Sequence, residues 1–260
     1  MLNRLLGKNV LITGASAGIG EACAYQFAAA GANVILTARR AERLEAVRAA
    51  INAKWPSVQV RVAALDVCDR AAVGRVVGSI AGPIDVLVNN AGVALGMEAV
   101  ADTGDEAIDG MVDTNIKGLL WVTRAVVNVM KGQAAGHIIM LGSIAGLHGY
   151  AGGSVYCATK SAVRAICESL RAETNALPIK VTEILPGKVE TEFSLVRFAG
   201  DREKADSVYR GIDPLVAEDI AETIVFAASR HPRCVLSEVV MLPKGQTEAG
   251  ITHLRKPGTA

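Results

Sequence analysis

Residues 13–20 read TGASAGIG and directly follow the apolar run NVLI at residues 9–12. Their glycines, Gly14, Gly18 and Gly20, are spaced four and then two residues apart, unlike the common Gly-x-Gly-x-x-Gly spacing. Because glycine has no Cβ, the backbone at Gly14 and Gly18 can turn sharply and approach a ligand closely. The free N–H groups of a helix beginning near Ile19 would then face a diphosphate. The stretch indicates a nucleotide-binding turn, with a plain packing turn as the alternative.

Strand-like apolar runs alternate with helical patterns outward from this turn. We expect strands at residues 10–13, 34–38, 58–65, 84–88, 137–141, 180–185 and 235–242. We expect helices at residues 18–30, 41–53, 71–80, 105–131, 154–176 and 217–230. This alternation with short connections implies parallel strand pairing and right-handed crossovers. The sequence therefore predicts an α/β fold, with a single Rossmann-type doubly wound parallel sheet and helices on both faces, over residues 1–260.

The composition excludes several classes of function. Lys and Arg number 27 against 26 Asp and Glu, which argues against a nucleic-acid partner. The five scattered cysteines and the four histidines lack metal-ligand spacing, so we expect no metal site, no disulfide framework and a reducing compartment. No apolar stretch reaches the roughly 18 residues of a membrane span, and the first one is too short for a signal peptide. We therefore expect a cytoplasmic protein without a membrane partner.

Several motifs together resemble those of the short-chain dehydrogenases/reductases. Residues 13–20 resemble the Thr-Gly-x-x-x-Gly-x-Gly cofactor motif of that family, and further matches follow in the family's order along nearly the whole chain. These matches are Asp66-Val67, Asn89-Asn90-Ala91-Gly92, Asn115, Ser143, Tyr156-x-x-x-Lys160 and Pro186-Gly187. The resemblance implies an oxidoreductase that uses a nicotinamide cofactor. The contacts that it implies for the cofactor are Gly14, Ser16, Gly18, Ile19, Gly20, Asp66, Val67, Asn90, Ala91, Gly92, Tyr156, Lys160, Pro186, Gly187, Val189 and Thr191.

The end of the second predicted strand bears on the choice of cofactor. NAD binding calls for an acidic residue there, whereas the 2′-phosphate of NADP calls for arginine. The strand is followed by Arg39 and Arg40, with no acid before Glu42. The guanidinium fork suits phosphate oxygens, so we expect NADP(H), with Arg39 and Arg40 as contacts. A solvated basic helix start is the alternative interpretation.

The spacing of Tyr156 and Lys160 suits acid–base chemistry. An unperturbed tyrosine has a pKa of about 10, and a nearby cation favours its phenolate. Lys160 follows Tyr156 by four residues, so the two side chains share one helix face. The resemblance implies that Tyr156 is the acid/base, that Ser143 binds the substrate oxygen, and that Lys160 binds the nicotinamide ribose and tunes Tyr156. It implies that Asn115 holds a water of a proton relay.

Two longer stretches narrow the substrate. Residues 90–96 and 191–198 resemble the subgroup of NADP-dependent 3-hydroxy acid dehydrogenases, and the resemblance continues to residues 217–220. It implies serine, L-allo-threonine, 3-hydroxyisobutyrate or the related semialdehydes as substrates. Arg197 lies in the segment 188–215, which we expect to form a lid, and we expect it to bind the substrate carboxylate beside the Tyr150 hydroxyl. An ordinary surface or intersubunit ion pair of Arg197 is the alternative.

Other interpretations of the same motifs remain open. The substrate could be a small neutral carbonyl compound, such as a sugar, diketone or keto ester, or a sulfonated aldehyde. A non-catalytic nucleotide-binding scaffold has no need of the intact set Asn115, Ser143, Tyr156 and Lys160. Lys188 departs from the apolar residue of the family pattern, and we expect it to point to solvent. The resemblance also implies a homotetramer built on helices 105–131 and 154–176, and we expect residues 244–260 to form a polar tail.

Overall fold

The computed structural model describes residues 4–252, and residues 1–3 and 253–260 lie outside the described part. In the described part, a parallel sheet has the strand order β3-β2-β1-β4-β5-β6-β9. The strands are β1 (Asn9–Thr13), β2 (Asn33–Ala38), β3 (Val60–Ala64), β4 (Val86–Asn89), β5 (Gly136–Leu141), β6 (Ile179–Pro186) and β9 (Glu238–Met241). The central strands β4 and β5 are buried along their whole length, because helices cover both faces of the sheet.

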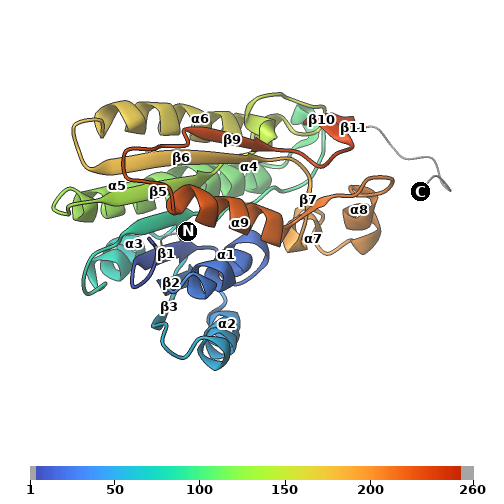
Figure 1. Ribbon diagram of the computed structural model, residues 1–260. Helices are drawn as coiled ribbons and strands as arrows, with labels where there is room; N and C mark the ends of the chain where they lie inside the picture. The colour runs from blue at the N-terminus through green and yellow to red at the C-terminus, as the bar shows by residue number, and fades with distance from the viewer. Residues whose placement is uncertain (1–3, 253–260) are drawn as a thin grey trace.

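Two layers of helices enclose the sheet (Figure 1). On one face, α1 (Gly18–Ala29), α2 (Ala41–Lys54) and α9 (Ala217–Ala228) bury side chains such as Phe27, Leu44 and Ile224. On the other face, α3 (Arg70–Gly78), α5 (Leu119–Met130) and α6 (Ser154–Glu173) bury side chains such as Met130 and Val163. The helix α4 (Asp105–Val112) packs against α6. The predicted doubly wound α/β fold is therefore confirmed.

The strand order reverses direction at β1, whose neighbours are β2 and β4. In open α/β sheets, ligands bind beyond the carboxyl ends of the strands at such a switch point. The predicted lid segment is built from β7 (Val189–Glu190), α7 (Glu192–Arg197), α8 (Arg202–Ser207) and β8 (Leu215–Val216). Figure 1 places α7 and α8 beside this end of the sheet, near β10 (Gln246–Glu248) and β11 (Ile251–Thr252). The fold thus brings the lid next to the glycine turn.

Several predicted elements differ from those of the structure. Residues 105–131 do not form one regular helix, because a π-helical turn, Asp113–Gly118, separates α4 from α5. The predicted strands 58–65 and 235–242 shorten to β3 and β9, and α7 and α8 were not predicted. The predicted tail 244–260 includes β10 and β11, and its residues 253–260 lie outside the described part. Between residues 4 and 252, no helix has the length and apolar character needed to cross a membrane.

Candidate active site

A pocket of about 870 Å³ lies at the switch point of the sheet. Most residues that the sequence predicted for the site line it together. They are Gly14, Ser16, Gly18, Ile19, Arg39, Arg40, Asp66, Val67, Asn90, Ala91, Gly92, Ser143, Tyr150, Tyr156, Lys160, Pro186, Gly187, Val189, Thr191 and Arg197. Gly20 and Asn115 are buried and do not line the pocket. Gly20 packs against the Gly14 backbone, so its part in the cofactor turn is to let that turn close.

The glycine turn has the backbone geometry of a phosphate cradle. Gly14 has a φ of +67° and Gly18 one of +56°, in the left-handed region that favours glycine. A Cβ at Gly14 would lie 2.8 Å from Asn90 Nδ2, and a Cβ at Gly18 would lie 3.3 Å from Thr191 Cβ. The helix α1 begins at Gly18, and no side chain caps its first N–H groups, so they are left for a ligand. The turn therefore fits the diphosphate of a dinucleotide.

Arginine side chains gather at the carboxyl end of β2. Arg40 donates to Ser16 Oγ from Nε at 3.3 Å and from Nη2 at 3.2 Å, and it pairs with Glu192 at 3.2 Å. Arg43 also pairs with Glu192, at 2.8 Å. Arg39 is exposed and makes no hydrogen bond or ion pair within residues 4–252. Ser16 thus orients Arg40, and the guanidinium of Arg39 is left to meet a phosphate group.

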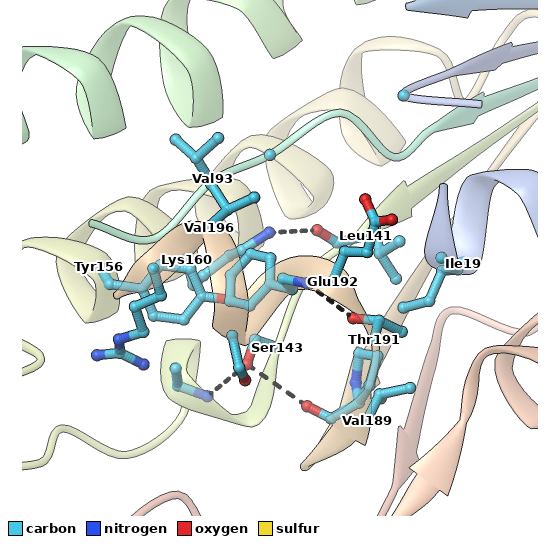
Figure 2. Close-up of a pocket in the computed structure, with 18 of the residues that line it drawn as sticks. Ile19, Val93, Leu141, Ser143, Tyr156, Lys160, Val189, Thr191, Glu192 and Val196 are labelled. Atoms are coloured by element: carbon cyan, nitrogen blue, oxygen red, sulfur yellow. Dashed lines mark hydrogen bonds between the residues drawn. The ribbon is translucent and has the colours of Figure 1, made fainter. Parts of the chain in front are cut away.

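Tyr156 and Ser143 lie together on the pocket wall (Figure 2). Ser143 follows β5, and its Oγ accepts a hydrogen bond from Ala145 N at 3.1 Å. Burial raises the pKa of Tyr156 above its ordinary value, and a hydrogen bond with Ser143 opposes this rise. The environment therefore keeps Tyr156 as a neutral phenol, the form that can give a proton to a carbonyl oxygen.

Lys160 lies one helical turn after Tyr156 on α6 and is only 7% exposed. Its Nζ donates to the Leu141 carbonyl oxygen at 2.7 Å, as Figure 2 shows, and lies 5.8 Å from the centroid of the Tyr156 ring. Burial lowers the pKa of Lys160 to about 8, while the charge of Glu183 acts in the opposite direction. The ammonium group is thus fixed beside Tyr156, with a pKa close to neutral pH.

Asn115 sits in the π-helical turn and is fixed by three hydrogen bonds. Its Oδ1 accepts from Val93 N at 2.8 Å, and its Nδ2 donates to Val93 O at 2.8 Å and to Thr159 Oγ1 at 3.1 Å. A Cβ at Gly92 would lie 3.2 Å from Asn115 Oδ1 and 3.7 Å from Lys160 Nζ. Gly92 therefore leaves the space between the amide and the ammonium free of side-chain atoms. Local π-helical turns of this kind are frequent at functional sites.

Arg197, at the end of α7, points its guanidinium group into the site. Nε donates to the Gly96 carbonyl oxygen at 2.9 Å, and Nη1 donates to the Tyr150 hydroxyl at 3.1 Å. The guanidinium carbon lies 5.8 Å from the centroid of the Tyr156 ring. Nη2 is buried without a hydrogen-bond partner, and no carboxylate within residues 4–252 pairs with this side chain. The structure thus shows Arg197 as a cation in the pocket wall, without an ion pair to any carboxylate of the described residues.

Lys188 does not point to solvent as expected. Its Nζ donates to the Val208 carbonyl oxygen at 2.9 Å, and its backbone N–H donates to Gln246 Oε1 at 2.8 Å. Burial lowers the pKa of the Lys188 ammonium group. The side chain therefore joins the start of the lid segment to the end of α8. This contact spans residues 20 apart, which a local sequence pattern does not reveal.

Comparisons with known proteins agree with this geometry. Residues 8–200 match the family model described as short chain dehydrogenase. The NADP-dependent 3-hydroxy acid dehydrogenase of Schizosaccharomyces pombe is 43% identical over 257 residues, which cover 97% of this chain and 98% of that protein. The serine 3-dehydrogenase of Rhizobium radiobacter is 38% identical over 250 residues, which cover 95% of this chain and 98% of that protein.

Solved structures of dehydrogenases and reductases are also similar to this chain. The closed form of a serine dehydrogenase complexed with NADP+ is 40% identical, with a TM-score of 0.89, and the match covers 95% of this chain and 100% of that one. A levodione reductase is 27% identical with a TM-score of 0.84, and the match covers 91% of this chain and 96% of that one. The family model and the relatives cover far more than half of the sequence. The chain therefore belongs to the short-chain dehydrogenase family.

Proposed function

We propose that this protein transfers a hydride between NADP(H) and a small 3-hydroxy acid or its semialdehyde, of the serine, L-allo-threonine or 3-hydroxyisobutyrate type. The observation that carries the choice of substrate is the guanidinium group of Arg197, whose Nη2 is buried in the site without a partner in the described chain. Burying a cation without an anion costs free energy, so the site is poorly satisfied until an anion binds. A substrate carboxylate supplies that anion.

The neighbours of Arg197 favour a short acid. The Tyr150 hydroxyl accepts a hydrogen bond from Arg197 Nη1, so its own proton is free to be donated to a carboxylate oxygen. Burial raises the pKa of Tyr150, which keeps that proton in place. Arg197 and Tyr156 border the same space, with 5.8 Å between guanidinium carbon and ring centroid. A short acid can therefore place its carboxylate at Arg197 and its hydroxyl at Tyr156.

Tyr156 acts as the acid/base at the reacting oxygen. NADP(H), when bound, supplies or accepts the hydride at the neighbouring carbon. During reduction, the Tyr156 phenol gives its proton to the carbonyl oxygen, which Ser143 also contacts. During oxidation, the positive charge of Lys160 stabilises the phenolate that takes the hydroxyl proton. Asn115 and Lys160 flank the space left at Gly92, where a water of the proton relay can lie.

Two observations support NADP(H) as the cofactor: the arginines at the end of β2 and the cofactor of the relatives. Gly14 and Gly18 hold the diphosphate, while Arg39 and Arg40 take the 2′-phosphate at the end of β2. Pro186, Gly187, Val189 and Thr191 line the same pocket and would contact the nicotinamide. The relatives named as NADP-dependent and the serine dehydrogenase solved with NADP+ support this assignment.

A panel of reactions tests the proposal. NADPH consumption is measured with small semialdehydes, a sulfonated aldehyde, sugars and diketones, and NADP+ reduction with the matching hydroxy acids. We expect the highest kcat/KM with the semialdehydes and 3-hydroxy acids, and NADP(H) preferred over NAD(H). A preference for neutral sugars or diketones would contradict the role of Arg197. A preference for the sulfonated aldehyde would show that Arg197 binds an anion, with a sulfonate in place of the carboxylate.

We further propose that the protein is a homotetramer in the cytoplasm. Phe226 on α9 and Val240 on β9 expose apolar side chains, 48% and 51% of their surface, which a partner subunit could cover. Val163 and Leu170 of α6 are instead buried in the chain's own core. The location rests on the scattered cysteine thiols. Light scattering in solution measures the assembly, and a monomer at assay concentration would contradict it.

A further inference from the structure

Glu183 is a buried acid in the middle of β6, and the proposed chemistry does not use it. Its side chain has no exposed surface, and neither carboxylate oxygen has a hydrogen-bond partner within the described residues. Its neighbour on β5 is the apolar Met140 and its neighbour on β9 is Glu238. A buried carboxylate in this state costs free energy that an apolar residue would not. Its position relative to Lys160 suggests what it does.

Glu183 lies against Gly142, and Lys160 bonds to the carbonyl oxygen of the residue before it, Leu141. A Cβ at Gly142 would lie 3.1 Å from Glu183 Cδ, so the absence of a side chain at Gly142 makes room for the carboxylate. The carbonyl oxygen of the preceding residue, Leu141, accepts the hydrogen bond from Lys160 Nζ at 2.7 Å. Lys160 makes no ion pair within 4.0 Å in residues 4–252. Glu183 is the buried carboxylate whose negative charge acts on it from further away.

We propose that Glu183 is a positioning residue that keeps Lys160 protonated across the Leu141–Gly142 peptide and so sets the pH range in which Lys160 assists Tyr156. This inference rests on the proposed roles of Lys160 and Tyr156. The next residue after this peptide is Ser143, so the same segment carries the group that contacts the substrate oxygen. Glu183 acts through Lys160 and does not touch the substrate.

The charges around Lys160 and Glu183 determine in which direction each pKa moves. Burial lowers the pKa of Lys160 to about 8, and the Glu183 charge raises it. Burial and Glu238 raise the pKa of Glu183 to about 7, whereas Arg171, Arg164 and Lys160 lower it. The ammonium is lost as the pH rises through about 8, and the carboxylate is lost as the pH falls through about 7. The opposite charges therefore coexist at neutral to slightly alkaline pH.

Two further titratable side chains of α6 lie in the same region, Glu168 and Cys167. Glu168 is exposed and pairs with Arg164 at 3.2 Å. The Cys167 thiol is buried, and burial together with the charge of Glu183 raises its pKa, so it stays protonated. Neither group supplies the buried negative charge beside Lys160. Glu168 therefore offers a matched control, as a second acid of the same neighbourhood that lies on the surface.

The test substitutes Glu183→Gln, which keeps the shape and removes the charge. The titration of Lys160 is followed by NMR on protein with isotope-labelled lysine, assigned with Lys160→Arg. We expect Lys160 to lose its proton about one pH unit lower in Glu183→Gln, a tenfold change in proton concentration, and at the wild-type pH in Glu168→Gln. The alkaline limb of the kcat profile should move by the same amount. An unchanged Lys160 titration in Glu183→Gln would overturn the proposal.

A second variant keeps the proposal testable if Glu183→Gln does not fold. Glu183→Met also removes the charge and suits the apolar neighbour Met140, so Lys160 should again titrate at a lower pH than in the wild type, and no downward shift would overturn the proposal. The NMR titration needs no turnover. A shifted titration in protein that turns over no hydroxy acid or carbonyl would therefore count against the proposed function and leave the Glu183–Lys160 coupling intact.

Discussion

Glu192, the first residue of the lid helix α7, pairs with Arg40 at 3.2 Å at the cofactor end of the pocket. The same carboxylate pairs with Arg43 at 2.8 Å. If the 2′-phosphate binds at Arg40 as proposed, it competes with this carboxylate, and the two ion pairs also tether the lid to the start of α2. Glu192→Gln should therefore lower the KM for NADP+ and raise the KM for the hydroxy acid, each by roughly twofold to fivefold, as expected for exposed ion pairs.

The control for this prediction is Glu45→Gln, because Glu45 pairs with Arg48 elsewhere on α2. It should leave both KM values unchanged. Steady-state kinetics with each substrate varied in turn separates the two effects. A rise in both KM values for Glu192→Gln would show that the carboxylate only orients the arginines.

Gly14→Ala should abolish NADPH binding. The φ of +67° is strained for alanine, and the new Cβ would lie 2.8 Å from Asn90 Nδ2 and 3.1 Å from Ala91 Cα. Gly74→Ala is the matched control, because Gly74 is an exposed helical glycine with nothing within 4 Å of a Cβ, and this change should stabilise the fold slightly. Fluorescence titration with NADPH measures the binding. Wild-type affinity in Gly14→Ala would rule out the glycine turn as the diphosphate cradle.

Tyr156→Phe should lower kcat by about 10²–10⁴-fold, because the ring stays in place and only the acid/base is lost. The affinity for NADPH should stay close to that of the wild type, since the cradle and the arginines are untouched. Single-turnover and binding measurements on the same preparation separate the two quantities. A kcat near that of the wild type would remove Tyr156 from its proposed role.

His137 should make the fold sensitive to acid. Its side chain is 3% exposed, its Nε2 lies 2.8 Å from Thr182 Oγ1, and burial lowers its pKa to about 3. Because the unfolded chain binds this proton more tightly, the free energy of unfolding falls as the pH drops below about 6.5 and continues to fall toward pH 3. The loss approaches about 1.4 kcal/mol per pH unit in this window.

His137→Gln removes this titration. Urea unfolding at a series of pH values between neutrality and pH 4 should therefore give a shallower dependence for the variant than for the wild type. Parallel curves for the two proteins would show that His137 takes up its proton without unfolding.

Where one segment carries the signal, local motifs identified residues that the structure brings together in one pocket. Gly14 and Gly18 are recognisable because a positive φ demands glycine, and Tyr156 and Lys160 because four residues make one helical turn. The alternating strands and helices likewise gave the doubly wound sheet. In each case the physical constraint acts within a few residues of the chain.

Contacts between distant segments escaped prediction. Glu192 and Arg43 are 149 residues apart, and nothing in the sequence around either one indicates the other. The hydrophobic pattern of residues 105–131 predicts one long helix. It does not reveal the π-helical turn around Asn115, whose side chain bonds to the distant residues Val93 and Thr159. The carboxylate of Glu183 occupies room that Gly142, just after the neighbouring strand β5, leaves free.

The most direct test of the account is the ratio of kcat/KM for 3-hydroxyisobutyrate to that for the matching neutral diol, measured with NADP+ in the wild type and in Arg197→Met. Methionine keeps much of the side-chain volume and removes the charge. We predict that the substitution lowers kcat/KM for the acid by roughly tenfold to a hundredfold, as for loss of a charged hydrogen bond, and changes it little for the diol. Equal losses on both substrates would contradict the claim that Arg197 binds the carboxylate.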